Sequence, residues 1–222
     1  MRQRDVWRDA IPLDEATIAA QHLVKVWKAI SASQAQHVKY SVSEPKLTER
    51  LHSYLCKFSG ESGLTGFWQN ESQHALYDAA GNLLDRTRKD ITYSSNAGKR
   101  LHLIFEFKKL TRTSVKTYQG KKGMRRFVDG NYGNNEPLAA MVGMLQHTDR
   151  APVESLYKSL SNPRVRGDLC MVHDADSRYL RKPSTVFPML PEAEFDTEHR
   201  RPPENAPPGG TTTLVHLFIE FP

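Results

Sequence analysis

The sequence predicts an α/β protein of the α+β kind, in which a central mixed β-sheet is flanked by helices. Apolar residues recur at helical spacing in residues 13–34 and 43–58. From residue 67 to residue 107, short β-prone runs alternate with turn residues, and a further strand-like run covers residues 211–221. A chain of 222 residues is long enough for one good core with extensions, so we expect a single compact domain.

The two N-terminal helices are predicted by different signals. The first rests on helical spacing alone and should pack as an N-terminal extension, residues 1–41; its apolar positions are Ile18, Leu23, Val24, Val26, Trp27 and Ile30. In the second, Ser43 is suited to be the N-cap, and Pro45 stands in the first turn, where proline is tolerated. Leucines then recur every four residues, at positions 47, 51 and 55.

The middle of the chain is predicted to form an antiparallel meander. Residues 67–107 carry hairpin-like turn signals at 80–82 and 96–98. Downstream we expect a helix within 113–130, an apolar helix over 138–147 and a short helix over 151–160. Residues 42–147 would form the core, and residues 148–222, a helix, a loop and a closing strand, would pack on it.

Composition excludes several classes of protein. No apolar run approaches the ~20 residues of a membrane helix, and the first residues are charged where a signal peptide would be apolar. We therefore expect a soluble, cytoplasmic protein with no membrane partner. Cys56 and Cys170 stand alone, which excludes a CxxC zinc site and a disulfide framework, and both are expected to be buried thiols.

Positive charge is concentrated in one segment. Residues 86–126 hold thirteen of the 31 lysines and arginines and only two of the 25 acids, a net charge of +11 in a chain of net charge +6. The rest of the chain is therefore acidic, at −5. A basic segment in an acidic protein is typical of nucleic-acid binding, because phosphate neutralisation dominates affinity. The alternative is a solvated basic face.

The second acid of this segment lies on a predicted strand, where alternate side chains share a face. The core face carries Leu101, Leu103, Phe105 and Phe107, and the opposite face carries His102, Ile104, Glu106 and Lys108. A turn at 94–99 would pair this strand with the run that follows Asp90, so Asp90 and Glu106 could converge. Neighbouring carboxylates repel unless they are protonated or bridged by a cation, and such oxygen ligands suit Mg²⁺ or Mn²⁺. The alternative is a solvated Glu and Lys pair.

Asp90, a gap of fifteen residues and Glu106-Phe107-Lys108 together resemble the signature of the PD-(D/E)XK nuclease superfamily, with Lys89 in place of the usual proline. The resemblance covers about residues 42–147 and implies a restriction endonuclease-like core of α-β-β-β-α-β order. It also implies phosphodiester hydrolysis with Mg²⁺ or Mn²⁺ as cofactor. Asp90, Glu106 and the Phe107 carbonyl would then be metal ligands, and Lys108 would assist the attacking water.

Nucleases of this superfamily often add a glutamate from the first core helix, and Glu44 and Glu49 are the candidates. At 100° per residue, Glu44 falls inside the leucine stripe of residues 43–58 and Glu49 points away from it. We therefore expect Glu44 to join the catalytic residues. A plain helix-dipole role in the first turn is the alternative.

Other residues are assigned by charge or by the resemblance. Seven basic side chains are expected to position the phosphate backbone without reading bases: Lys109, Arg112, Lys116, Lys121, Lys122, Arg125 and Arg126. The resemblance gives Tyr118 and Gln119 an accessory place facing phosphate or metal-bound water. In residues 195–204, FDTEHRRPPE, His199 could act as a general base, but we favour a surface loop there. His173, Asp174 and Asp176 are expected to form a turn.

These features favour a Mg²⁺-dependent endonuclease acting on nucleic acid, with DNA preferred. The sequence leaves open whether it forms a homodimer or has a partner protein. The alternative is a nucleic-acid-binding subunit of the same fold, with little activity alone, in a larger DNA-processing or host-defence complex. A third reading, in which the motif is coincidental, requires Asp90 and Glu106 to lie far apart.

Overall fold

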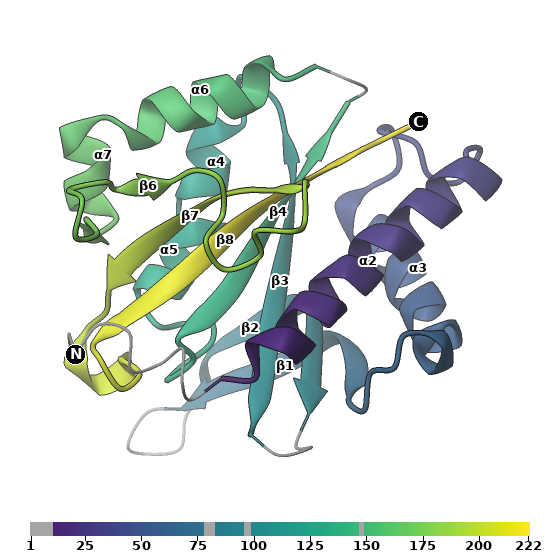
Figure 1. Cartoon of the computed structure of the whole chain (residues 1–222), viewed down its shortest axis with the longest axis horizontal. Helices are drawn as coiled ribbons and strands as arrows, with labels where there is room; N and C mark the ends of the chain where they lie inside the picture. The colour runs from purple at the N-terminus through teal and green to yellow at the C-terminus, as the bar shows by residue number, and fades with distance from the viewer. Residues whose placement is uncertain (1–10, 78–82, 96–98, 147–148) are drawn as a thin grey trace.

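The computed structural model describes residues 11–77, 83–95, 99–146 and 149–222, with the backbone alone for 71–77 and 83–89. It is an α+β fold in which helices flank one mixed sheet of eight strands (Figure 1). The order across the sheet is β1-β2-β3-β4-β8-β7-β5, and β6 pairs with β7. The central strands are therefore far apart in sequence.

The strands form an antiparallel half and a half that contains the parallel pairs. β1 (Phe67–Tyr77), β2 (Leu83–Ser95) and β3 (Leu101–Leu110) make the predicted meander; its two turn signals lie outside the described residues. β4 (Leu138–Leu145) pairs in parallel with both β3 and β8 (Thr211–Glu220). β7 (Ala193–Arg200) runs antiparallel to β8, and the short β5 (Met171–Val172) and β6 (Leu180–Arg181) pair with β7.

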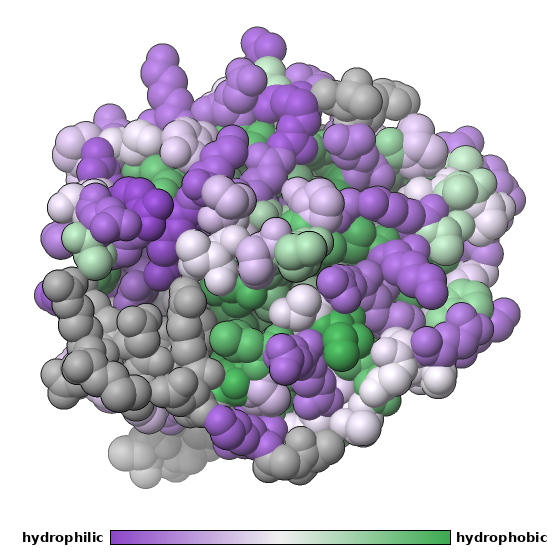
Figure 2. Space-filling view, viewed as in Figure 1, coloured by the Kyte–Doolittle hydropathy of each residue, from purple (hydrophilic) through white to green (hydrophobic). Residues whose placement is uncertain are grey.

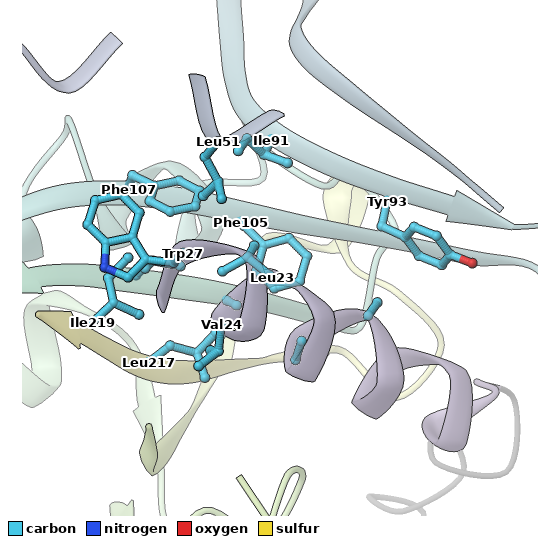
Figure 3. Packing of buried hydrophobic residues seen from close by; sticks show 14 of the residues in the cluster. Leu23, Val24, Trp27, Leu51, Ile91, Tyr93, Phe105, Phe107, Leu217 and Ile219 are labelled. Carbon is cyan, nitrogen blue, oxygen red and sulfur yellow. The ribbon is translucent and has the colours of Figure 1, made fainter. Parts of the chain in front are cut away.

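Two long helices cover one face of the sheet. α2 (Leu13–Ser33) and α3 (Glu44–Lys57) occupy the two predicted N-terminal segments, and the 3-10 turn η1 (Ser59–Glu61) follows α3. In Figure 3, Leu23, Val24 and Trp27 of α2 point toward the aromatic and aliphatic side chains of β3 and β8. The Trp27 indole also donates a 2.8 Å hydrogen bond to the Glu220 carbonyl. α2 therefore shares the main core of the domain.

Shorter helices contribute to the core on the opposite face. They are α4 (Val115–Gln119), α5 (Met124–Val128), α6 (Ala151–Leu160) and α7 (Pro163–Asp168), and η2 (Pro203–Asn205) lies before β8. The helix expected within 113–130 is divided in two. Gly123 lies at the break, because a Cβ there would stand 2.0 Å from the Tyr118 carbonyl oxygen.

Three expectations were wrong. Residues 138–145 form β4 and not a helix: every residue is buried on both faces, and such a strand has no alternation to distinguish it from a buried helix. The loop favoured at 195–204 is largely β7, whose polar side chains point inward. Cys56 and Cys170 are exposed, Cys56 on the side of α3 away from its leucine stripe and Cys170 after α7.

The surface is mainly polar on the face shown in Figure 2, where small apolar patches lie between hydrophilic side chains. Among the described residues, no helix combines the length and the apolar character needed to cross a membrane.

Candidate active site

The site lies where β2 and β3 separate. Ile91 pairs with Phe105, and beyond this pair β3 continues to Leu110 beside β4. The backbone N–H groups of Phe107 and Lys109 therefore need acceptors other than β2. Asp90 Oδ2 accepts from the Phe107 N–H at 2.8 Å, and Glu44 Oε2 accepts from the Lys109 N–H at 3.2 Å. Two carboxylates thus hold the open edge of β3.

Lys108 lies at the centre of the acidic residues. Its ammonium is 2.8 Å from Glu44 Oε1, 2.9 Å from Glu106 Oε1 and 3.9 Å from Asp90 Oδ2, and it donates to the Phe107 carbonyl. The side chain is only 12% exposed. Asp90 and Glu106 therefore both lie close to the Lys108 ammonium. A coincidental motif would require the two acids to lie far apart.

Glu106 is the most deeply buried of these acids. Its side chain is 0% exposed, and its Oε2 atom has no hydrogen-bond partner among the described residues. Burial, with a smaller contribution from the charge of Asp90, raises the pKa of Glu106 to about 8. An unpartnered buried carboxylate oxygen is costly, so this atom marks where a further cation or donor would be favourable.

The pKa values of Asp90 and Lys108, the neighbours of Glu106, are also raised, each for a different reason. Burial raises the pKa of Asp90, and the nearby Lys108 and the bond from Phe107 only partly oppose this effect. Burial alone would lower the pKa of Lys108, but the surrounding carboxylates outweigh it and raise that pKa above its ordinary value. Lys108 therefore remains a charged ammonium at neutral pH.

Arg126, which the sequence assigned to the phosphate-positioning residues, is a second cation in the site. From α5, its guanidinium contacts Glu106 Oε1 at 3.3 Å and the Tyr132 hydroxyl, and it lies 4.7 Å from the centroid of the Tyr132 ring. The side chain remains 29% exposed. Only its membership of the basic segment indicated a role; the contact with Glu106 is a tertiary one that no local pattern encodes.

The donor set fits a small hard cation in chemistry. Asp90, Glu106 and the Phe107 carbonyl supply oxygen ligands, which Mg²⁺ and Mn²⁺ prefer, and the orphaned Glu106 Oε2 supplies a reason for one. In the part of the chain that the structure describes, no group of three His, Cys, Asp or Glu side chains is arranged to hold a metal by itself. A metal would therefore also need the backbone carbonyl, substrate oxygens or water.

Some basic side chains of residues 86–126 are bound to other groups of the protein, and others are exposed to solvent. Lys109 donates to the Tyr40 and Val42 carbonyls, and Arg125 pairs with Asp129 at 2.8 Å and also donates to the Asp168 carbonyl. The remaining predicted phosphate contacts, other than Arg126, are exposed: Arg112, Lys116, Lys121 and Lys122.

The predicted accessory residues Tyr118 and Gln119, and His199, lie at or near the core that the shorter helices cover. Gln119 accepts from the Ser159 hydroxyl at 3.0 Å, and the Tyr118 hydroxyl is 3.0 Å from His216 Nδ1. His199 is fully buried in β7 between the Leu169 carbonyl and the Thr197 hydroxyl, and burial lowers its pKa to about 4. None of these described contacts reaches the carboxylates, so the placement of these three side chains at a site is not supported.

Two other predictions can be placed. Residues 173–178 form the expected turn, in which Asp174 accepts from the N–H groups of Asp176 and Arg178. Glu49 is exposed, whereas Glu44 reaches Lys108, as the leucine stripe predicted.

Comparison of the chain with family models, curated proteins and solved structures gives no match.

Proposed function

We propose that the protein is a metal-dependent nuclease with a restriction endonuclease-like core, hydrolysing phosphodiester bonds and preferring DNA. The observation that carries the proposal is the Lys108 ammonium held between Glu44 and Glu106, with Asp90 beside it, at the opening between two strands. The order α3, β1, β2, β3, α4 and α5, then β4 supports it, because it follows the α-β-β-β-α-β order of the family that the motif resembles.

Asp90, Glu106 and the Phe107 carbonyl would hold the Mg²⁺ or Mn²⁺ ion. When bound, such an ion supplies Lewis acidity and lowers the pKa of a coordinated water. The orphaned Glu106 Oε2 and the raised pKa values of both acids are what a second positive charge would relieve.

Lys108 would act as a hydrogen-bond donor and not as a general base. A general base must give up its proton near the working pH, and the neighbouring acidic side chains raise the pKa of this ammonium above its ordinary value. Its role is to orient the attacking water and to stabilise negative charge on the phosphate. Glu44 fixes the direction of the ammonium through its 2.8 Å contact.

Arg126 would bind the phosphate of the substrate. Its guanidinium is partly exposed and is oriented by Tyr132, and the planar donor fork suits phosphate oxygens. With Lys108 it places two positive charges beside the scissile group, which favours an anionic substrate.

The test is incubation of the purified protein with plasmid DNA, linear DNA and single-stranded RNA, in Mg²⁺, in Mn²⁺ and in EDTA. We expect metal-dependent cutting of DNA that the Glu106→Gln variant loses. Binding without cutting in any metal would favour the subunit alternative, and metal-independent cutting that survives in Glu106→Gln would overturn the proposed site.

A further inference from the structure

A polar groove lies at the connection between α2 and α3. It has a volume of about 490 Å³, and its polar lining consists of Gln36, His37, Ser41, Ser43, Lys46 and Arg50. No acid lines it. The groove is therefore positively charged without any contribution from the basic segment 86–126.

The groove is fixed next to the catalytic residues. Ser43, which lines it, immediately precedes Glu44, whose carboxylate contacts Lys108. Lys109 binds the same connection: its ammonium donates to the Tyr40 and Val42 carbonyls and lies 4.9 Å from the centroid of the Tyr40 ring. The wall of the groove is thus attached to the end of β3 that carries the site.

The groove lining suits phosphate oxygens. His37, Ser41, Ser43 and Lys46 are exposed, and the Ser43 hydroxyl makes no capping bond to α3, so these groups can face a ligand. Arg50 is half-buried and oriented by a 2.8 Å bond to Gln34. The described lining of the groove contains no aromatic side chain on which a base could stack.

We propose that this groove binds the phosphodiester backbone of the nucleic-acid substrate close to the bond that is cut, without reading its sequence. The inference rests on the proposed function, because it takes a nucleic acid as the substrate of the neighbouring site. Phosphates on one strand of B-DNA are spaced ~3.4 Å apart along the helix axis, so a strand held at Lys108 presents further phosphates within a few nucleotides.

Binding is measured by fluorescence anisotropy of a labelled DNA duplex over a series of salt concentrations. All variants carry Glu106→Gln and are measured in EDTA, so that no cutting interferes. We expect Lys46→Glu to weaken binding about tenfold at low salt, and to reduce the slope of log K against log salt by about one phosphate contact. Lys46→Ala should give a smaller loss of the same kind for duplexes of unrelated sequence.

The matched control is Lys25→Glu, which reverses an exposed lysine on α2 away from the groove and should leave binding unchanged. Equal DNA affinity of Lys46→Glu and the control, or no DNA binding by the parent protein, would overturn the proposal that the groove binds DNA. Failure of the nuclease proposal is distinguished by the cutting assay with the otherwise unchanged chain. Binding that depends on Lys46, without cutting, would support the groove proposal and contradict the nuclease proposal. Cutting, with binding that does not depend on Lys46, would support the nuclease proposal and contradict the groove proposal.

Discussion

The ammonium of Lys108 lies 2.9 Å from Oε1 of Glu106, and both side chains leave β3 on the same face. The other oxygen of that carboxylate is buried without a described partner. Oε1 of Glu106 is therefore paired with cations of the protein itself, Lys108 and Arg126, whereas Oε2 is not. This arrangement makes the charge state of the site the property that experiments can address most directly.

Replacing Lys108 should make the protein depend on metal for stability. Lys108→Met removes the cation that lies among three acidic side chains, so we expect a lower melting temperature in EDTA and cutting reduced by about 10² or more. Added Mg²⁺ should raise the melting temperature of the variant more than that of the parent. Thermal unfolding in both buffers measures this, and equal shifts would contradict metal binding at these carboxylates.

Glu44 and Glu49 form a matched pair on one helix. Glu44→Gln removes the charge that orients Lys108, so we expect a loss of cutting of roughly tenfold or more with normal folding. Glu49→Gln changes an exposed side chain and should have no effect. Cutting rates at saturating DNA compare the two, and equal rates would remove Glu44 from the site.

Glu106→Gln should alter how stability depends on pH. The pKa of Glu106 rises from an ordinary 4.5 to about 8 in the folded chain. Between these values the unfolded chain releases a proton that the folded chain retains, so the parent loses stability as pH rises through this window. Glutamine carries no charge and escapes that loss.

The gain of Glu106→Gln over the parent should therefore be near zero below about pH 4.5, grow up to about pH 8, and reach on the order of a few kcal/mol. Urea unfolding in EDTA at pH 4.5, 6 and 8.5 measures it, with Glu49→Gln as the control. A gain in stability that does not change with pH would contradict the raised pKa of Glu106 in the folded chain.

The exposed basic residues after α4 should control DNA affinity through charge alone. Reversing Lys121 and Lys122 to glutamate should weaken binding to all sequences and reduce the salt dependence by about two phosphate contacts. The control reverses exposed Lys25 and Lys158, which lie on α2 and α6. An unchanged salt slope in the first variant would exclude this segment from the DNA footprint.

Trp27 tests how firmly α2 belongs to the core. The side chain is 1% exposed, donates to the Glu220 carbonyl and packs edge-on against Phe221. Trp27→Ala should cost about 3–5 kcal/mol of unfolding free energy, whereas Trp27→Phe should cost about 1–2 kcal/mol from the lost hydrogen bond and smaller ring. Chemical denaturation with a single shared transition is expected, and a separate early transition would make α2 an independent extension.

Much of the site followed from local periodicity. Alternation along residues 101–108 placed Glu106 and Lys108 on one face, and the leucine stripe of α3 selected Glu44 over Glu49. These patterns hold because strand and helix geometry fixes directions within one element. The position of Arg126 could not be predicted, because it depends on how α5 packs relative to β3.

The predictions for the segments that form β4 and β7 were wrong for opposite reasons. In β4 every side chain is apolar or small, since both faces of a central parallel strand are covered, and the sequence retains no period of two. In β7 the inward positions are polar because they have partners elsewhere: Asp196 accepts from the Ser184 hydroxyl and from the N–H and hydroxyl groups of Thr185. Polarity alone therefore suggested a loop where tertiary hydrogen bonds make a buried strand.

The position of β8 has a consequence for synthesis of the chain. β4 is apolar throughout, and one of its two neighbours, β8, comes after β5, β6 and β7 in sequence. Until residues 211–220 emerge from the ribosome, that side of β4 is an unpaired hydrophobic edge, the kind of edge that recruits other chains into aggregates. A nascent or proteolysed chain that stops short of β8 should therefore require chaperone protection, although β8 contributes none of the residues of the proposed site.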